Sequence, residues 1–267
     1  MSFHYLEQIR QTNPLFHCIT NYVAANFTAN GLLAIGASPL MSANVAEVAE
    51  IQQFAKGLLL NIGTPNGPEN IEAMILAGKA ANQVGIPVLL DPVGSGATSY
   101  RRQVVEKLLS EVKFALIRGN AGEIAPLAQI QWRSKGVDAG AGEADLAQVA
   151  KQVAQQYHCI VAISGETDFV SDGQRVAKVQ NGTPLFPKIT GSGCLLGAVC
   201  AAFLSVAPAS AYFDAVVEAT TVYAVAGEVA ARTLNRTQTG TFAVKFLDQL
   251  AEINMTLAEQ QGRVIYA

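Results

Sequence analysis

The sequence predicts an α/β protein in three layers, with a central, mostly parallel sheet covered by helices on both faces. Short apolar runs rich in valine, isoleucine and leucine alternate with longer segments of helical pattern, which is typical of βαβ units. These runs are apolar at consecutive positions, as in strands that are buried on both faces. Half of the residues are hydrophobic and 15% are charged, which indicates a folded globular chain rather than a disordered one.

Five apolar runs are the candidate strands, at residues 37–42, 58–62, 87–91, 114–118 and 159–163. The segments between them have helical patterns, and we expect helices at 21–35, 44–55, 68–84, 100–110, 121–128 and 143–157. After residue 163 the pattern changes. Ser171-Asp172-Gly173 separates two alternating segments, which predicts a hairpin at the edge of the sheet. Three more helices are expected, at 193–206, 211–234 and 239–259.

The 267 residues suit one large α/β domain or two small ones. No internal repeat divides the chain, so we take residues 1–267 as a single domain without a separate lid domain. The linker-like stretch 131–142 contains three glycines and is expected to be a mobile surface loop inside that domain.

Composition also narrows the class of function. A net charge of −3 gives no sign of a nucleic-acid-binding protein. The N-terminus lacks the apolar segment of a signal peptide, and no apolar run reaches the ~20 residues that would span a bilayer. The four cysteines have no C-x-x-C spacing, so we expect reduced thiols and a cytoplasmic protein without membrane contact; they are Cys18, Cys159, Cys194 and Cys200.

Polar, glycine-rich segments follow four of the predicted strands, at 61–64, 91–96, 118–123 and 164–168. Ligands of open parallel sheets bind beyond the carboxyl ends of the strands. Loops that only turn the chain use the same residue types. Four such loops at one edge nevertheless favour a ligand cleft.

The stretch Thr190-Gly-Ser-Gly-Cys194 precedes an apolar helix and is a candidate anion site. Glycines let backbone N–H groups close on a ligand, and the first N–H groups of a helix are unpaired and partly positive. The backbone of Gly191, Ser192 and Gly193 would then bind phosphate. Taken alone, this short motif is explained at least as well by a turn with a serine N-cap. Cys200, further along the helix, is expected to be a core residue.

Three charged residues stand at strand ends. Asp91 and Glu123 would together supply two carboxylates to one hydrated Mg²⁺, although a turn-former and a helix-dipole contact explain them too. Arg118 ends an apolar strand, where a charge is costly unless it is paired. Its partner is either a carboxylate or a triphosphate.

The N-terminal segment 17–31 is rich in asparagine, and Asn26 and Asn30 share one helix face. His17 is expected to be hydrogen-bonded and non-catalytic. No second histidine lies at metal-ligand spacing, which argues against zinc. The sequence lacks a Gly-x-Ser-x-Gly elbow, and His4 and His158 stand in unfavourable contexts, so serine-hydrolase chemistry is poorly supported.

Five blocks in order, from residue 17 to about 204, resemble the hydroxyethylthiazole kinase family of thiamine salvage. They are HCITNYVAANFTANGLLAIGASPLM, NIG, LLDPVGSGAT, IRGNAGEIAPLA and ITGSGCLLGAVCAAFL. The resemblance implies a ribokinase-like fold without the lid of ribokinase itself. Asn120-x-x-Glu123 is similar to that superfamily's metal and phosphate motif. Residues 191–194 are similar to its Gly-x-Gly-Asp anion-hole and base motif.

The resemblance implies ATP-dependent phosphorylation of the primary alcohol of 5-(2-hydroxyethyl)-4-methylthiazole, with Mg²⁺ as cofactor. It assigns the thiazole to Met41, Gly191 and Asn26. It assigns ATP to Arg118 and Ser164 with the backbone of 191–193, and Mg²⁺ to Asp91 and Glu123 through water. It further implies a homotrimer with active sites at subunit interfaces.

Cys194 stands where ribokinase-like sugar kinases have a catalytic aspartate, so the resemblance makes it the candidate catalytic residue. A helix N-terminus can lower the pKa of a thiol, whereas a nearby triphosphate would raise it. Two other functions stay open. One is a kinase of this fold that acts on another vitamin precursor, such as hydroxymethylpyrimidine, and the other is a non-catalytic ligand sensor.

Overall fold

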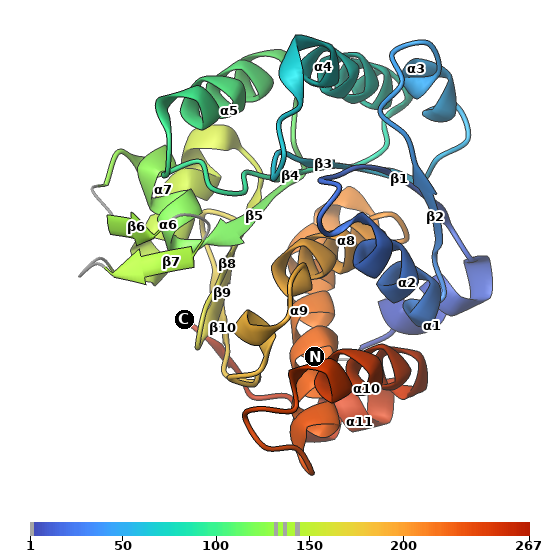
Figure 1. Ribbon diagram of the computed structural model, residues 1–267, viewed down its shortest axis with the longest axis vertical. Helices are drawn as coiled ribbons and strands as arrows, with labels where there is room; N and C mark the ends of the chain where they lie inside the picture. Colours follow the sequence, from blue (N-terminus) through green and yellow to red (C-terminus); the bar gives the residue numbers. More distant parts are fainter. Residues whose placement is uncertain (1–2, 131–132, 136–137, 142–144) are drawn as a thin grey trace.

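The computed structural model describes residues 3–130, 133–135, 138–141 and 145–267. Within them, a nine-stranded sheet has the strand order β11-β10-β9-β8-β5-β4-β3-β1-β2. Its neighbours from β2 to β8 pair in parallel, and β9, β10 and β11 continue the sheet in antiparallel. Figure 1 shows helices packed on both sides of this sheet, which confirms the predicted three-layer α/β architecture.

The strands of the large sheet are β1 (Leu15–Ile19), β2 (Ser38–Met41), β3 (Gly57–Asn61), β4 (Val88–Asp91), β5 (Leu116–Asn120), β8 (Ile160–Ser164), β9 (Asp168–Ser171), β10 (Val176–Val179) and β11 (Val264–Tyr266). A separate antiparallel pair is formed by β6 (Arg133–Lys135) and β7 (Asp138–Ala141). The predicted loop 131–142 therefore contains regular structure, and its residues 131–132, 136–137 and 142 lie outside the described part of the chain.

One helical layer consists of α1 (Tyr5–Thr12), α2 (Ala25–Ile35), α8 (Ser192–Leu204), α9 (Tyr212–Ala231), α10 (Thr239–Glu252) and α11 (Met255–Gln261). The other consists of α3 (Val48–Ile51), α4 (Gly67–Val84), α5 (Ser99–Glu111), α6 (Ala121–Ile124) and α7 (Leu146–Tyr157). Within the described residues, every helix is too short or too polar to span a lipid bilayer.

Each parallel strand contributes side chains to both layers, because successive residues of a strand point to opposite faces. In β3, Leu59 packs in the core beneath α8 and α9, whereas Leu58 and Leu60 pack in the core beneath α4. This burial on both faces is why the strands read as unbroken apolar runs.

Several predicted elements need correction. Strand β1 was not predicted, because its short run LFHCI contains His17 and was assigned to the polar N-terminal segment. The predicted helix 44–55 is helical only at Val48–Ile51. The predicted helix 239–259 is two helices, because Asn254 leaves the helical conformation and its side chain accepts the Leu257 N–H as the cap of α11. The hairpin of β9 and β10 is confirmed.

Candidate active site

Four strands of the sheet have apolar side chains in their first part and polar side chains at their carboxyl ends, and the side chains continue to alternate between the two faces of the sheet. In each of them a core leucine or alanine faces α8, and the polar residue two positions later faces the same side. The pairs are Leu59 and Asn61 in β3, Leu89 and Asp91 in β4, Leu116 and Arg118 in β5, and Ala162 and Ser164 in β8. The alternation of the strands therefore gathers these polar side chains in front of the first turns of α8.

The N-terminus of α8 approaches these strand ends through its glycines. A Cβ on Gly193 would lie 3.2 Å from Nη1 of Arg118, and a Cβ on Gly197 would lie 3.2 Å from Oδ2 of Asp91. Gly191 caps the helix with φ +85°, a conformation that L side chains rarely adopt. The missing side chains let the guanidinium and the carboxylate pack directly on the helix backbone, and the guanidinium at Gly193 lies next to the unpaired N–H groups of the first turn.

Arg118 and Asp91 form a buried ion pair, with 3.9 Å between Nη1 and Oδ2. Nη2 of Arg118 also donates to Oγ of Ser164. Nε of Arg118 and Oδ1 of Asp91 are buried without a hydrogen-bond partner. Burial raises the pKa of Asp91 to about 7, and Glu123 adds to this effect, while Arg118 opposes it. Two polar atoms of the site are thus left for a ligand to satisfy.

Glu123 ties two neighbouring loops together. With Asn120 it forms a capping box of α6, in which Oε2 of Glu123 accepts the Asn120 N–H at 2.7 Å. Oε1 accepts the N–H of Gly94, in the loop after β4, at 2.9 Å. Burial raises the pKa of Glu123, and these backbone N–H groups oppose the rise. Both oxygens are engaged by the backbone, which leaves their remaining lone pairs for water rather than for direct contact with a metal ion.

A chain of side-chain amides links Asp91 to Cys194. Nδ2 of Asn61 donates to Oδ2 of Asp91, and Nδ2 of Asn21 donates to Oδ1 of Asn61, both at 2.8 Å. Nδ2 of Asn21 also lies 3.3 Å from Sγ of Cys194 as a donor. Neither asparagine was among the predicted site residues. Asn61 could have been found from its alternation with Leu59, whereas Asn21 follows the strand that was missed.

Cys194 lies in the first turn of α8 and is partly buried. Burial raises the pKa of its thiol to about 11, and the charge of Asp91 adds to the rise. Hydrogen bonds from Asn21 and the positive charge of Arg118 act in the opposite direction but do not prevail. Burial therefore outweighs the lowering of the thiol pKa that is expected at a helix N-terminus, and it favours the protonated thiol at neutral pH.

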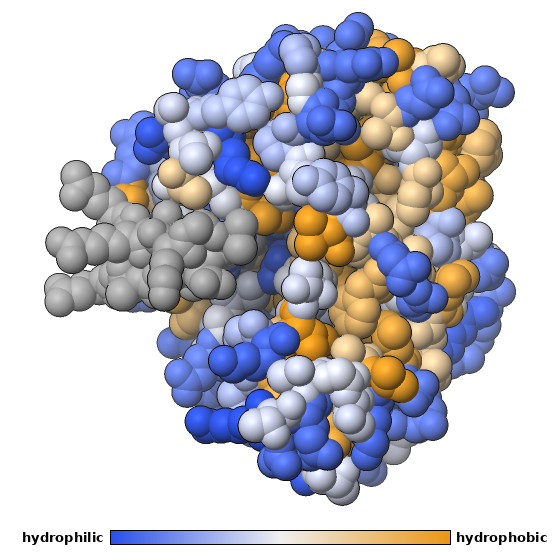
Figure 2. All heavy atoms as spheres, viewed as in Figure 1, coloured by the Kyte–Doolittle hydropathy of each residue, from blue (hydrophilic) through white to orange (hydrophobic). Residues whose placement is uncertain are grey.

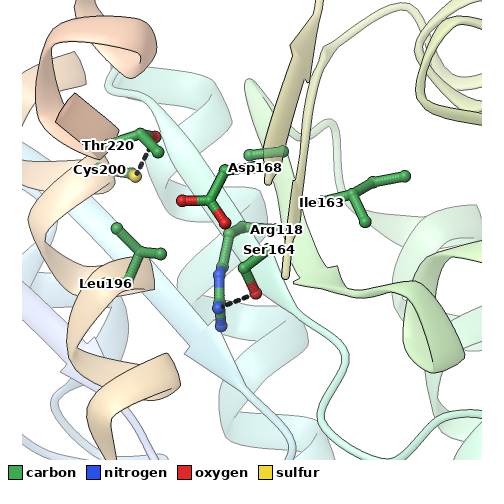
Figure 3. Close-up of a pocket in the computed structure, with 8 residues that line it drawn as sticks. Arg118, Ile163, Ser164, Asp168, Leu196, Cys200 and Thr220 are labelled. Atoms are coloured by element: carbon green, nitrogen blue, oxygen red, sulfur yellow. Dashed lines mark hydrogen bonds between the residues drawn. The ribbon is translucent and has the colours of Figure 1, made fainter. Parts of the chain in front are cut away.

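Figure 3 shows a narrow pocket beside this cluster, where Asp168 points toward Arg118 and Ser164. Oδ1 of Asp168 accepts the Gly165 N–H at 2.8 Å, and burial raises the pKa of Asp168 to about 7. Asp168 was not predicted as a site residue, although it ends the loop after β8. Cys200 lines the pocket from within the core, as predicted.

Other predicted site residues lie outside the buried cluster. Met41 is 36% exposed at the end of the edge strand β2. Asn26 is exposed on α2, where its Oδ1 accepts from Nδ2 of Asn30 at 3.1 Å. The hydroxyl of Ser192 donates to the carbonyl of Phe186, so only its backbone is left for an anion.

His17 is buried and hydrogen-bonded, as predicted for a non-catalytic residue. Its Nδ1 lies 2.7 Å from Nε2 of Gln52, and its Nε2 lies 3.0 Å from the carbonyl oxygen of Ser42. Among the described residues, no group of three or more histidine, cysteine, aspartate and glutamate side chains is arranged to hold a metal ion. A cation at this site would therefore depend on one or two carboxylates together with water or phosphate oxygens.

Comparison with known proteins identifies close relatives of the whole chain. The model of the hydroxyethylthiazole kinase family matches residues 6–256. A hydroxyethylthiazole kinase of Pasteurella multocida is 62% identical over 262 residues, which cover 98% of each chain. The solved structure of a hydroxyethylthiazole kinase from Pyrococcus horikoshii has a TM-score of 0.88 and 34% identity, and the match covers 98% of this chain and 97% of that one. A ribokinase-like superfamily protein from Enterococcus faecalis shares the fold, with a TM-score of 0.63 at 10% identity over 90% of this chain and 88% of that one.

Proposed function

The chain belongs to the hydroxyethylthiazole kinase family, and we propose that it transfers the γ-phosphoryl group of ATP to the primary alcohol of 5-(2-hydroxyethyl)-4-methylthiazole. The observation that carries this proposal is the contact of the ion pair of Asp91 and Arg118 with the glycine-rich first turns of α8. A carboxylate for a cation, a guanidinium and unpaired helix N–H groups are the parts that phosphoryl transfer requires.

ATP is bound between α8 and the ends of β5 and β8. The backbone N–H groups of Gly191, Ser192 and Gly193 and the guanidinium of Arg118 receive the phosphates. Ser164 holds that guanidinium by accepting a hydrogen bond from Nη2, and its hydroxyl proton is free to be donated to ATP. Helix N-termini favour negative charge, so this side of the site suits a triphosphate.

The site also fits Mg²⁺. Oδ1 of Asp91 is buried and has no hydrogen-bond partner, and hard cations prefer such carboxylate oxygens. Glu123 would reach the ion through water, because its two oxygens already accept backbone N–H groups. When bound, Mg²⁺ neutralises charge on the phosphates. The repulsion between Asp91 and Glu123, which contributes to the raised pKa of Asp91, is relieved by a cation.

The acceptor alcohol is bound at Gly191 and Cys194, between α8 and the amide chain. A protonated thiol at this position packs against the hydroxyethyl group and donates a hydrogen bond; it does not hold a preformed thiolate base. Phosphoryl transfer depends mainly on positioning and on stabilisation of charge, so a strong base is not required. The part of Cys194 in catalysis is then to orient the attacking oxygen.

Met41 and Asn26 complete the thiazole site in a homotrimer, whose active sites lie at subunit interfaces. Both residues are on the surface of the single chain. Figure 2 shows hydrophobic residues gathered on the right of the view, over the region of α2 and β2 in Figure 1. Exposed apolar side chains here include Val23, Leu33 and Met41. An apolar surface next to an edge strand supports contact with another subunit. The four free cysteines support a cytoplasmic location.

A substrate panel tests the function directly. Release of ADP is measured with ATP and Mg²⁺ and with the thiazole alcohol, hydroxymethylpyrimidine or no acceptor. We expect ADP release that requires the thiazole alcohol. ADP release that depends on hydroxymethylpyrimidine instead would indicate a kinase of another vitamin precursor. Binding of the thiazole without ADP release would indicate a ligand sensor, and in either case the proposal would be wrong.

A further inference from the structure

Arg101, in the first turn of α5, joins two loops of the site through one guanidinium group. Nη1 donates to the carbonyl oxygens of Ile62 at 2.9 Å and Val93 at 2.6 Å. Nη2 donates to the carbonyl oxygen of Gly63 at 2.8 Å. Ile62 and Gly63 follow β3, and Val93 follows β4. The side chain therefore cross-links neighbouring strand ends from behind the site.

The backbone segments that Arg101 holds carry the groups proposed for the metal and phosphate end of the site. Asn61 directly precedes Ile62, and its Oδ1 accepts the N–H of Gly63 at 2.9 Å. The carbonyl oxygen of Asp91 accepts the N–H groups of Ile62 at 3.2 Å and of Val93 at 2.9 Å. The N–H groups of these loops thus face the site residues, while the carbonyl groups face the guanidinium.

Local preference does not explain an arginine at this position. Arg101 lies in the first turn of α5, where the helix dipole disfavours a positive charge. Partly buried carbonyl groups at the end of a sheet need donors, and a planar guanidinium supplies several in a fixed fork. A lysine has a single point charge and cannot reproduce that geometry. The three hydrogen bonds to carbonyl oxygens offset the unfavourable interaction of this guanidinium with the helix dipole.

We propose that Arg101 is a positioning residue of the phosphoryl-transfer site. By holding the loops after β3 and β4 against each other, it sets the distance between Asn61 and Asp91 and the place of the Gly94 N–H that Glu123 accepts. Arg101 acts through these residues and contacts no reacting atom. This inference rests on the proposed kinase function, because the loops matter for catalysis only if the site transfers phosphate.

The test compares R101A and R101K with R102A. Arg102 is the exposed neighbour on the same helix, and R102A is expected to behave as wild type. A displacement of catalytic groups by about 1 Å costs on the order of 10²-fold in rate, so we expect R101A to lose about that much in kcat. R101K keeps the charge without the fork, and about 10-fold loss is expected for it. Methylguanidine at millimolar concentration should restore part of the activity of R101A and none of that of R102A.

Amide hydrogen exchange tests the same proposal without a measurement of enzymatic activity. In R101A and R101K, the amides of residues 62–64 and 93–95 should exchange faster, while the strands β4 and β5 keep their protection. An R101A with kcat within twofold of wild type would overturn the proposal, and so would loops whose exchange is unchanged. If R101A does not fold, kcat and amide exchange of R101K alone test the proposal. A wild-type chain without kinase activity refutes the proposed function, and the exchange result still shows whether Arg101 holds the loops.

Discussion

The substitution G193A should weaken the use of ATP and leave the fold intact. The added Cβ would lie 3.2 Å from Nη1 of Arg118, which is shorter than an ordinary contact, and 3.4 Å from Nη2. The guanidinium cannot withdraw freely, because it is buried between the carboxylate of Asp91 and the hydroxyl of Ser164. Either the helix or Arg118 must move by a few tenths of an ångström, into or away from the space of the phosphates.

The expected size follows from two opposing contributions. Overpacking of this kind costs about 1–3 kcal/mol of stability. Alanine in place of glycine inside a helix returns roughly 0.5–1 kcal/mol. The free energy of unfolding of G193A should therefore fall by at most about 2.5 kcal/mol, which a domain of this size tolerates. Misplacing Arg118 and the α8 N–H groups by a few tenths of an ångström should lower kcat/KM for ATP by about 10-fold, or about 1.4 kcal/mol of transition-state stabilisation.

The assay is coupled ADP release at varied ATP with saturating thiazole alcohol, together with thermal unfolding. G240A is the matched control, because its Cβ would meet no atom within 4 Å near the start of α10. We expect G240A to match wild type in kcat/KM and G193A to fall while its Tm stays within a few degrees. A G193A variant with kcat/KM for ATP within twofold of wild type would refute the phosphate site at α8.

Three further outcomes are expected. S164A frees Arg118 from its hydroxyl partner, and the lost hydrogen bond to a charged group should raise KM for ATP by about 10-fold, measured by the same assay. C194A should lose less than about 10-fold in kcat, because a thiol whose pKa is about 11 cannot supply the roughly 10²–10⁴-fold rate gain of a general base. A pH profile of kcat with an ionisation that is present in wild type and absent in C194A would contradict this. The apparent Kd for Mg²⁺ should rise by about tenfold per pH unit below about pH 7, because a proton on the buried carboxylate of Asp91 then competes with the ion. Mg²⁺ titrations that give the same Kd from about pH 5.5 to 8 would contradict the proposed role of Asp91 as a Mg²⁺ ligand.

The predicted site residues that the structure brings together share one property: each follows an apolar strand or begins an apolar helix. Asp91, Arg118 and Ser164 could be predicted to lie together because parallel strands end at the same edge of a sheet. Asn21 was missed because β1 is short and contains a histidine, so the strand that positions it was not recognised. The assignment of Met41 and Asn26 to the substrate rests only on the family resemblance, because no pattern in the sequence connects these two residues with the strand ends.

Contacts between different loops could not be predicted from the sequence for another reason. Glu123 was predicted as a metal residue from its place in the chain, and the structure shows its carboxylate accepting N–H groups from two segments. Arg101 looks like any charged residue at the start of a helix until its three carbonyl acceptors are known. Such roles depend on distances between segments that are 29 to 39 residues apart, and periodicity carries no information about them.

The energetics of the buried cluster argue for ligand binding over a structural role. Asp91 is fully buried and Arg118 is 5% exposed, yet their closest charged atoms are 3.9 Å apart and each side chain keeps an unpartnered polar atom. Removing two charges from water for so loose a pair costs more than the pair returns. Well-packed apolar residues would stabilise the sheet better, as they do two positions earlier in the same strands. Phosphate oxygens and a cation would supply the partners that Nε of Arg118 and Oδ1 of Asp91 lack, so the cluster is better explained as a ligand site than as a structural ion pair.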